Sequence, residues 1–199
     1  MRTVEIIGYK RANLGKSESK HLRNEGNVPC VLYGGTEQVH FYAAAIQFRD
    51  VIYTPAACFV KLNIEGTEYT AVLQDSQFHP VSENLLHADF LQLFEGKPVK
   101  MDIPVKTVGN SPGVANGGAL TVKRPKLSVL ALPKNMPENI EVDISTLKLG
   151  KSTKVGDLPA GDYEIQNSPL VTIASVAVPR ALRGKSEDEL DEAQEEGEE

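Results

Sequence analysis

Two imidazoles and two carboxylates fall within one short region of the sequence: Asp75, His79, His87 and Asp89. His87 and Asp89 lie two residues apart on a predicted strand, so both side chains point to the same face. Such a pair could be a general base with the carboxylate that orients it, or part of a metal site. It could equally be a polar strand face with an internal hydrogen bond, or a face that recognises a ligand. No Gly-x-Ser-x-Gly motif accompanies it, so a hydrolase using Asp75, His79 and His87 is the less favoured alternative.

A second set of residues, near the N-terminus, carries positive charge: Lys10, Arg11, Lys16, Lys20 and Arg23. Across residues 10–23 the only acidic residue is Glu18, which leaves this basic cluster with a net charge of +4. Its last three members share a helix face, because they are spaced four and three residues apart. A loop that leads into a helix offers both cations and unpaired backbone N–H groups to phosphate. The nearby Tyr9 and Tyr33 could stack on bases or pack in the protein interior.

Together the two sets of residues favour RNA as the partner. A side chain that only contacts phosphate would be Lys or Arg. His87 and Asp89 can instead form hydrogen bonds with base edges or 2′-hydroxyl groups. The wide and shallow minor groove of RNA displays both of these.

Several other classes of function are disfavoured. There is no Gly-x-Gly-x-x-Gly loop, and Gly15-Lys16-Ser17 resembles the end of a Walker motif but has Lys10 where the upstream glycine is required. Cys30 and Cys58 form no Cys-x-x-Cys pair, which disfavours a structural zinc site and a disulfide scaffold. Without a signal peptide or an apolar stretch of membrane-spanning length, we expect a cytoplasmic protein with no cofactor, metal, membrane or small-molecule substrate.

The formal net charge of −6 is concentrated at the C-terminal end. Residues 183–199 carry nine acidic and two basic residues, net −7, which leaves the rest of the chain near neutrality at +1. Because charge attraction in solution is screened over about 10 Å, the acidic total does not exclude a nucleic-acid partner. This acidic tail is predicted to be a disordered, solvated segment. Alternatively, it mimics phosphate and occupies the basic cluster until RNA displaces it.

Alternating apolar residues and turn signals predict a mainly β protein. Strands are expected at 4–9, 28–33, 39–43, 59–64, 69–73 and 86–93, and then at 99–108, 119–122, 126–132, 140–144, 163–166 and 170–178. Gly34-Gly35 and Glu65-Gly66 predict hairpin turns. A turn cluster at 95–98 predicts a boundary. The expected organisation is a β-rich domain at 1–94, an all-β sandwich or barrel at 95–182, and the acidic tail at 183–199.

Two short helices are expected to interrupt the strands of the first domain. Residues 17–25 predict a surface helix with Ser17 as its N-cap and Gly26 at its end. This helix would carry most of the basic cluster. Residues 46–53 predict another helix, with three apolar residues near one face: Ile46, Val51 and Ile52.

The order of residues in the first domain resembles a known family. The pattern Arg11-x-x-x-Gly15-Lys16-x-x-Ser19-Lys20-x-Leu22-Arg23-x-x-Gly26-x-Val28-Pro29-x-Val31-Leu32-Tyr33-Gly34-Gly35 resembles the start of the bacterial large-subunit ribosomal protein L-twenty-five family. The patterns Gln74-Asp75-x-Gln77-x-His79-Pro80 and Leu86-His87-x-Asp89-Phe90 resemble the end of its RNA-binding domain. The stretch Ile140-Glu141-Val142-Asp143-Ile144-Ser145 and the following residues resemble the long, two-domain form of the family, also called general stress protein CTC.

The resemblance implies a structural constituent of the large ribosomal subunit, without catalytic activity, that binds 5S ribosomal RNA through an N-terminal β-barrel. It implies RNA contacts at seven positions of this sequence: Arg11, Lys16, Ser19, Lys20, Tyr33, His87 and Asp89. This sequence departs from the family at Lys20 and His21, where paired arginines are usual; lysine lacks the two-pronged hydrogen bonding of arginine. The second domain is expected to contact neighbouring large-subunit components. An alternative function is a stress-related protein-binding module.

Overall fold

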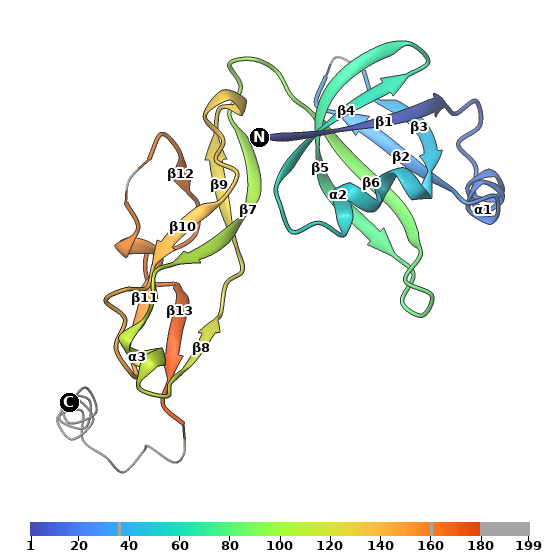
Figure 1. Ribbon diagram of the computed structural model, residues 1–199. Coiled ribbons are helices and arrows are strands. Elements are labelled where there is room, and N and C mark those ends of the chain that lie inside the picture. Colours follow the sequence, from blue (N-terminus) through green and yellow to red (C-terminus); the bar gives the residue numbers. More distant parts are fainter. Residues whose placement is uncertain (36, 160, 180–199) are drawn as a thin grey trace. The chain divides into compact units, whose positions relative to one another are not determined.

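The computed structural model describes residues 1–35, 37–159 and 161–179 (Figure 1). The acidic tail predicted at 183–199 therefore lies outside the described residues. The mainly β architecture expected from the sequence is confirmed, because strands account for most of the ordered elements in both halves of the chain. Within the described ranges no helix is long and apolar enough to cross a membrane.

The chain divides into two compact units. Met1–Asp102 with Leu130–Glu138 forms the first unit, and Ile103–Val129 with the described residues from Asn139 onward forms the second. The barrel strands of the first unit end at Gln92. We therefore keep domain limits at 1–94 and 95–182 as a proposal.

The first unit contains a closed barrel of six strands in the order β1-β3-β2-β6-β5-β4. The strands are β1 (Arg2–Lys10), β2 (Asn27–Tyr33), β3 (Val39–Ala44), β4 (Cys58–Ile64), β5 (Thr67–Phe78) and β6 (Leu85–Gln92). β1 pairs with β4 and β2 pairs with β6 in parallel, whereas the other neighbours are antiparallel. All six strands expected in this domain are present, and β1 and β5 extend beyond their predicted limits.

The barrel interior is filled by alternate residues of its strands. β4 shows the pattern most plainly, since every second residue is buried: Cys58, Val60, Leu62 and Ile64. Three fully buried rings meet in the core, where the centroid of Phe90 lies 5.9 Å from that of Phe41 and 6.2 Å from that of Phe48. Burial of each such ring contributes about 1.5–3 kcal/mol. Cys30 and Cys58 are buried free thiols, and burial raises the pKa of both.

The two predicted hairpins are confirmed. β2 and β3 are antiparallel across the turn that contains Gly34, and β4 and β5 are antiparallel across Glu65-Gly66. Glu65 and Gly66 have φ angles of 51° and 88°. Positive φ at both central residues is the geometry of the turn whose twist matches two antiparallel strands.

The two helical segments of the barrel domain differ in detail from their predictions. Helix α1 spans Lys16–Asn24 and has Gly15 as its N-cap, without a side-chain capping hydrogen bond, so the predicted N-cap Ser17 is wrong. The second segment is a 3₁₀ turn at Ala45–Phe48 followed by α2 (Arg49–Ile52). A 3₁₀ turn has three residues per turn, which shifts the buried face relative to an α-helix. Ile46 is consequently 78% exposed, and Phe48 is buried in its place.

The second half of the chain forms two small sheets. One has the strand order β10-β7-β9-β12 and the other has the order β11-β13-β8. The strands are β7 (Val99–Val108), β8 (Ala119–Val122), β9 (Lys126–Ala131), β10 (Ile140–Asp143), β11 (Ser152–Lys154), β12 (Glu164–Ile165) and β13 (Thr172–Ala177). Two elements were not predicted from the sequence: β11, which has no apolar residue, and the one-turn helix α3 (Pro112–Ala115). The all-β prediction for this half is otherwise confirmed.

The packing of Gly8 against Phe41 gives a test of the barrel core. A Cβ atom at Gly8 would lie 2.6 Å from Cδ2 of the buried Phe41 ring. We expect Gly8→Ala to lower the free energy of unfolding by about 1–3 kcal/mol, the usual cost of overpacking a core. Gly15→Ala is the control, since no heavy atom lies within 4 Å of that position. Urea denaturation measures both; equal stabilities of the two variants would contradict this account of the core.

Candidate nucleic-acid interface

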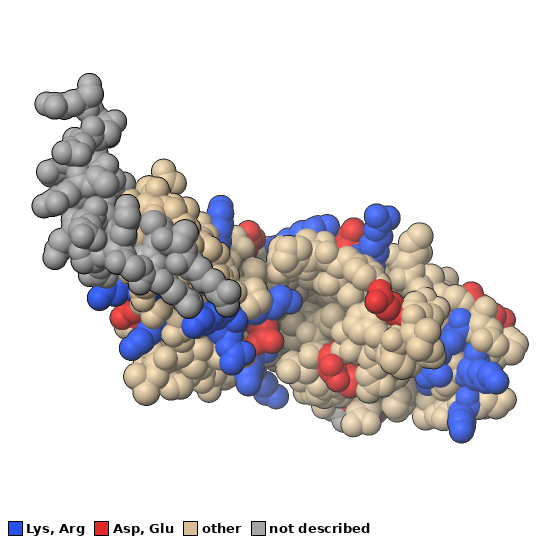
Figure 2. All heavy atoms as spheres, turned by 90° about the horizontal axis from the view of Figure 1, so that it is seen from below, with Lys and Arg blue, Asp and Glu red and all other residues tan. Residues whose placement is uncertain are grey.

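Helix α1 presents exposed cations at one end of the barrel. Leu22 is its one buried residue and packs the helix down, whereas Lys16 and Lys20 are exposed. Neither lysine has an ion-pair partner among the described residues. Figure 2 shows Lys and Arg side chains gathered at the right of the view, where Figure 1 places α1. The two lysines are therefore available to an anionic partner.

Arg11 and Ser19 hold the loop that enters α1. Nη2 of Arg11 donates to Oγ of Ser19 at 3.0 Å, and this hydroxyl donates in turn to the carbonyl of Gly15, also at 3.0 Å. Both side chains are half-buried. Nε of Arg11 is shielded from solvent and has no hydrogen-bond partner in the described part of the chain. Both predicted RNA-contact residues therefore form hydrogen bonds within the protein, and these hydrogen bonds fix the start of the helix.

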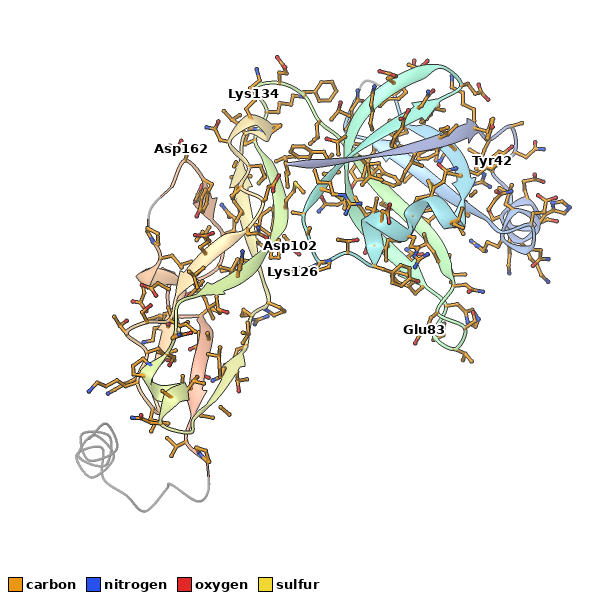
Figure 3. All side chains as sticks on the ribbon, viewed as in Figure 1. Tyr42, Glu83, Asp102, Lys126, Lys134 and Asp162 are labelled. Carbon is orange, nitrogen blue, oxygen red and sulfur yellow. The ribbon has the colours of Figure 1, made fainter. Side chains whose placement is uncertain are left out.

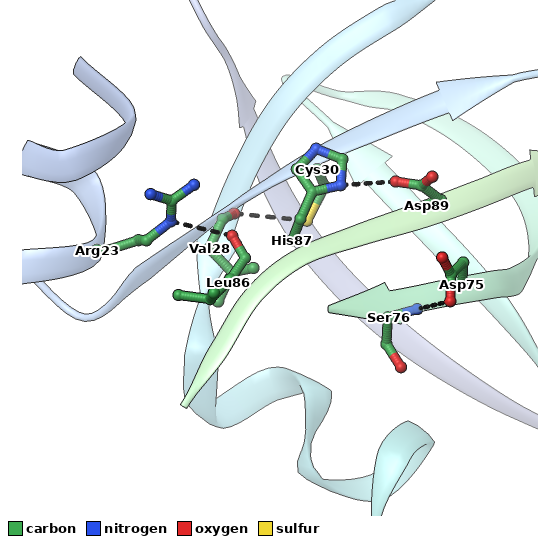
Figure 4. A network of polar contacts seen from close by, with 8 residues as sticks. All are labelled: Arg23, Val28, Cys30, Asp75, Ser76, Leu86, His87 and Asp89. Carbon is green, nitrogen blue, oxygen red and sulfur yellow. Dashed lines mark hydrogen bonds and ion pairs between the residues drawn. The ribbon is translucent and has the colours of Figure 1, made fainter. Parts of the chain in front are cut away.

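Arg23 connects α1 to the last barrel strand. Its Nε donates to the backbone carbonyl of Leu86 on β6 at 3.1 Å (Figure 4). The strand β6 also carries His87 and Asp89, so this hydrogen bond joins the helix of the basic cluster to the polar strand face. The spacing in the sequence placed Arg23 on one helix face with the two lysines but could not reveal this contact.

His87 and Asp89 form the close pair that their spacing predicts. Nδ1 of His87 lies 2.6 Å from Oδ1 of Asp89, and the two side chains are 29% and 31% exposed (Figure 4). They point outward from β6, while the alternate residues Ala88 and Phe90 are buried. Oδ1 of Asp89 is shielded from solvent and has no fully directed hydrogen bond among the described residues. The imidazole is its close polar neighbour.

Two further polar residues adjoin this pair through the strand register. Asp75 of β5 lies opposite Asp89, and Gln77 lies opposite His87. Oδ1 of Asp75 accepts a hydrogen bond from the backbone N–H of Ser76 at 2.8 Å (Figure 4). The outer surface of β5 and β6 is therefore polar and carries more carboxylate than cationic charge.

Tyr33 lies near the same carboxylates at the end of β2. Its pKa is raised above the ordinary value of a tyrosine, chiefly because burial removes water from the phenol, and then because Asp89 and Asp75 repel the phenolate. The phenol therefore keeps its proton at neutral pH and can donate a hydrogen bond. The polar strand face, defined here as Tyr33, Asp75, His87 and Asp89, offers both donors and acceptors.

The structure gives His79 a local role instead of a catalytic one. Its Nδ1 accepts hydrogen bonds from the backbone N–H groups of Val81 at 3.3 Å and Ser82 at 3.1 Å, within the loop between β5 and β6. This nitrogen is thus already engaged in shaping the loop. Among the described residues, no group of three or more His, Cys, Asp or Glu side chains could hold a metal ion.

Comparison with known proteins gives matches over nearly the whole chain. Residues 6–90 match the model of the Ribosomal L25p family, and residues 98–180 match the model of the C-terminal domain of ribosomal protein TL5. The large ribosomal subunit protein bL25 of Amoebophilus asiaticus is 56% identical over 183 residues, which cover 92% of this chain and 93% of that protein. The proteins of the same name from Cytophaga hutchinsonii and Bacteroides fragilis are 54% and 41% identical and also cover 92% of this chain, with 95% and 96% of their own length.

The hydrogen bond from Arg23 predicts how firmly α1 is held. We expect Arg23→Ala to speed amide hydrogen exchange in α1 roughly 5- to 10-fold, because a hydrogen bond of this kind contributes about 1 kcal/mol to holding a local element closed. Lys20→Ala is the matched control, since it removes an exposed cation of the same helix. Unchanged protection of α1 in Arg23→Ala would show that this bond does not hold the helix.

Proposed function

This chain belongs to the L25 family of bacterial large-subunit ribosomal proteins, and on that premise we propose that it binds 5S ribosomal RNA through the barrel domain. The protein is a structural constituent of the large ribosomal subunit in the cytoplasm and is not an enzyme. The family resemblance drawn from the sequence motifs is thereby confirmed. Binding to 5S RNA is the finer step, and the geometry of the barrel domain supports it.

One observation carries this proposal: exposed cations and a polar strand face are joined in one domain. Lys16 and Lys20 extend from α1 without partners among the described residues, and Arg23 ties that helix to β6. β6 in turn presents His87 and Asp89 on its outer face. An RNA that meets both surfaces finds charge for its phosphates and hydrogen-bonding groups for its grooves.

The two surfaces suit different parts of the RNA. Phosphate contacts supply most of the electrostatic affinity and fix the orientation of the protein, whereas contacts with base edges and sugars supply selectivity. Lys16 and Lys20 take the first role. Arg11 and Ser19, which hold the loop beside these lysines, would contact the RNA backbone at the edge of the same surface.

The polar strand face takes the second role. A net negative surface would repel bare phosphate, but carboxylates accept hydrogen bonds from 2′-hydroxyl groups and exocyclic amines. The protonated phenol of Tyr33 supplies a donor there. The proposed RNA-contacting residues are therefore those expected from the family resemblance: Arg11, Lys16, Ser19, Lys20, Tyr33, His87 and Asp89.

The second domain is proposed to contact a neighbouring component of the large subunit. Three exposed cations lie close together in the sequence here: Lys123 and Arg124 in the connection between β8 and β9, and Lys126 as the first residue of β9. None of them has an ion-pair partner in the described part of the chain. Figure 3 labels Lys126, at the start of β9. These side chains favour an anionic surface as the neighbour.

The electrostatic part of the proposal predicts a salt dependence. If four cations contact phosphate, the logarithm of the affinity for 5S RNA should fall with the logarithm of the salt concentration with a slope of roughly −3 to −4. We expect the double variant Lys16→Ala/Lys20→Ala to bind more weakly and to flatten this slope by about 1.5–2. Lys61→Ala is the control, because its ammonium pairs with Glu68 at 2.8 Å on another wall of the barrel. A slope near zero for the unmodified protein would contradict the proposal.

The polar strand face predicts selectivity. We expect His87→Ala and Asp89→Asn each to lower the ratio of affinities for 5S RNA and for an unrelated folded RNA by roughly 10-fold, the value of a hydrogen bond to a charged group. The salt slope should stay unchanged, because neither variant removes a phosphate contact. Thr70→Ala, an exposed change on β5, serves as the control. An unaltered affinity ratio would remove this role from the pair.

A further inference from the structure

Tyr9 and Tyr42 form an aromatic pair on the outside of the barrel. They lie opposite each other in the register of β1 and β3, and their ring centroids are 5.7 Å apart with an interplanar angle of 33°. Tyr9 is 53% exposed, and Tyr42 is partly exposed. Phe41, which precedes Tyr42 on β3, points inward and is fully buried. The pair therefore contributes nothing to the barrel core, which leaves the ring of Tyr9 open to a partner.

The chain connects this pair directly to the loop that enters α1. From Tyr9 it passes through Lys10 to Arg11, whose backbone N–H donates to the carbonyl of His40 on β3 at 3.0 Å. Arg11 then holds Ser19 at the start of α1. Figure 3 labels Tyr42 at the end of the barrel where β1 finishes and α1 lies. The exposed ring thus lies on the strand that leads directly into the loop and helix carrying the cations that the proposed function assigns to phosphate.

An exposed ring beside cations has a specific use in RNA binding. Unpaired bases in folded RNA are splayed out and stack on aromatic side chains, while neighbouring Lys and Arg hold the backbone. The ring of Tyr42 supports that of Tyr9 from one side, so that little conformational freedom remains to be lost on binding. Ile7, two residues earlier on the same outward face of β1, is also exposed and extends the apolar surface.

We propose that Tyr9, supported by Tyr42, is a stacking site for one unpaired base of the RNA that the barrel domain binds. This inference rests on the proposed function, because it takes the bound RNA as its ligand. Stacking on Tyr9 would contribute to affinity by a different interaction from the phosphate contacts of Lys16 and Lys20. Stacking releases no counterions, so its contribution does not depend on salt in the way that phosphate contacts do.

The test compares three variants of the full-length protein with 5S RNA. We expect Tyr9→Ala to weaken binding by roughly 5- to 150-fold, the range found for base–aromatic stacking. The salt slope should equal that of the unmodified protein. Tyr9→Phe keeps the ring and should bind within about twofold. Tyr53→Ala is the matched control, because Tyr53 is 70% exposed and follows α2, away from the strand pair.

A second measurement keeps the proposal testable if Tyr9→Ala unfolds. In protein labelled with 3-fluorotyrosine, the resonance missing from Tyr9→Phe identifies Tyr9. Stacking on a base should shift that resonance upfield when 5S RNA is added, whereas the resonance of Tyr53 should stay in place.

Three outcomes would overturn the inference. Undiminished affinity of Tyr9→Ala, or an unshifted Tyr9 resonance in the complex, would show that no base stacks there. An equal loss in Tyr9→Phe and Tyr9→Ala would assign the effect to the hydroxyl group. Normal binding of Tyr9→Ala to naked RNA with weakened binding to the large subunit would assign the surface to a neighbouring protein. In each case a loss of binding in Lys16→Ala/Lys20→Ala would leave the proposed function standing.

Discussion

Closure of the barrel is the constraint on which the rest of the first domain depends. A closed sheet has no free edge, so each strand must place alternate residues inside and outside. Once Phe90 and Ala88 are buried, His87 and Asp89 have to face outward. The same rule on β1 and β3 buries Phe41 and exposes Tyr9 and Tyr42. The core therefore determines which side chains are offered to a partner.

Helix α1 connects its exposed lysines to the strand that carries Asp89, yet the lysines form no ion pair with the described carboxylates. Both arginines of this region are engaged within the protein: Arg11 donates to Ser19, and Arg23 donates to a backbone carbonyl of β6. The lysines remain outside, beyond ion-pair distance of the described carboxylates. Arginine suits these hydrogen-bonding positions because its planar guanidinium can donate in several directions, while lysine presents a mobile point charge to solvent. The arginines therefore position the helix and its loop, whereas the lysines remain available to a partner, as the chemistry of the two side chains favours.

Much of this fold could be predicted from the sequence because the barrel strands are short and regular. Alternation identified strands such as β4, and the pair Glu65-Gly66 located a hairpin through its backbone requirement. The prediction failed where a local rule was weak. Ser17 looked like an N-cap, but the N-cap is Gly15, two residues earlier, and Ile46 was assigned to a buried face that a 3₁₀ turn rotates outward.

The candidate site likewise has features that local sequence predicts and features that it does not. The pairing of His87 with Asp89 follows from their two-residue spacing, which any strand converts into a shared face. The contact between Arg23 and Leu86 spans 63 residues of sequence, and no local pattern encodes it. The opposition of Asp75 and Asp89 depends on register, which includes an irregularity between Leu73 and Asp75. Long-range register and hydrogen bonding are fixed by packing of the whole barrel, so they become visible only in three dimensions.

The lysines of α1 shape how affinity would be distributed. A lysine contact with phosphate is a screened point-charge interaction, and its value falls as salt rises. Stacking on Tyr9 would add affinity that salt does not remove. A chain with exposed lysines and an exposed ring would thus bind RNA through two contributions of different physical origin. At low salt the lysines would dominate, and at high salt the ring would supply a larger share of the remaining affinity.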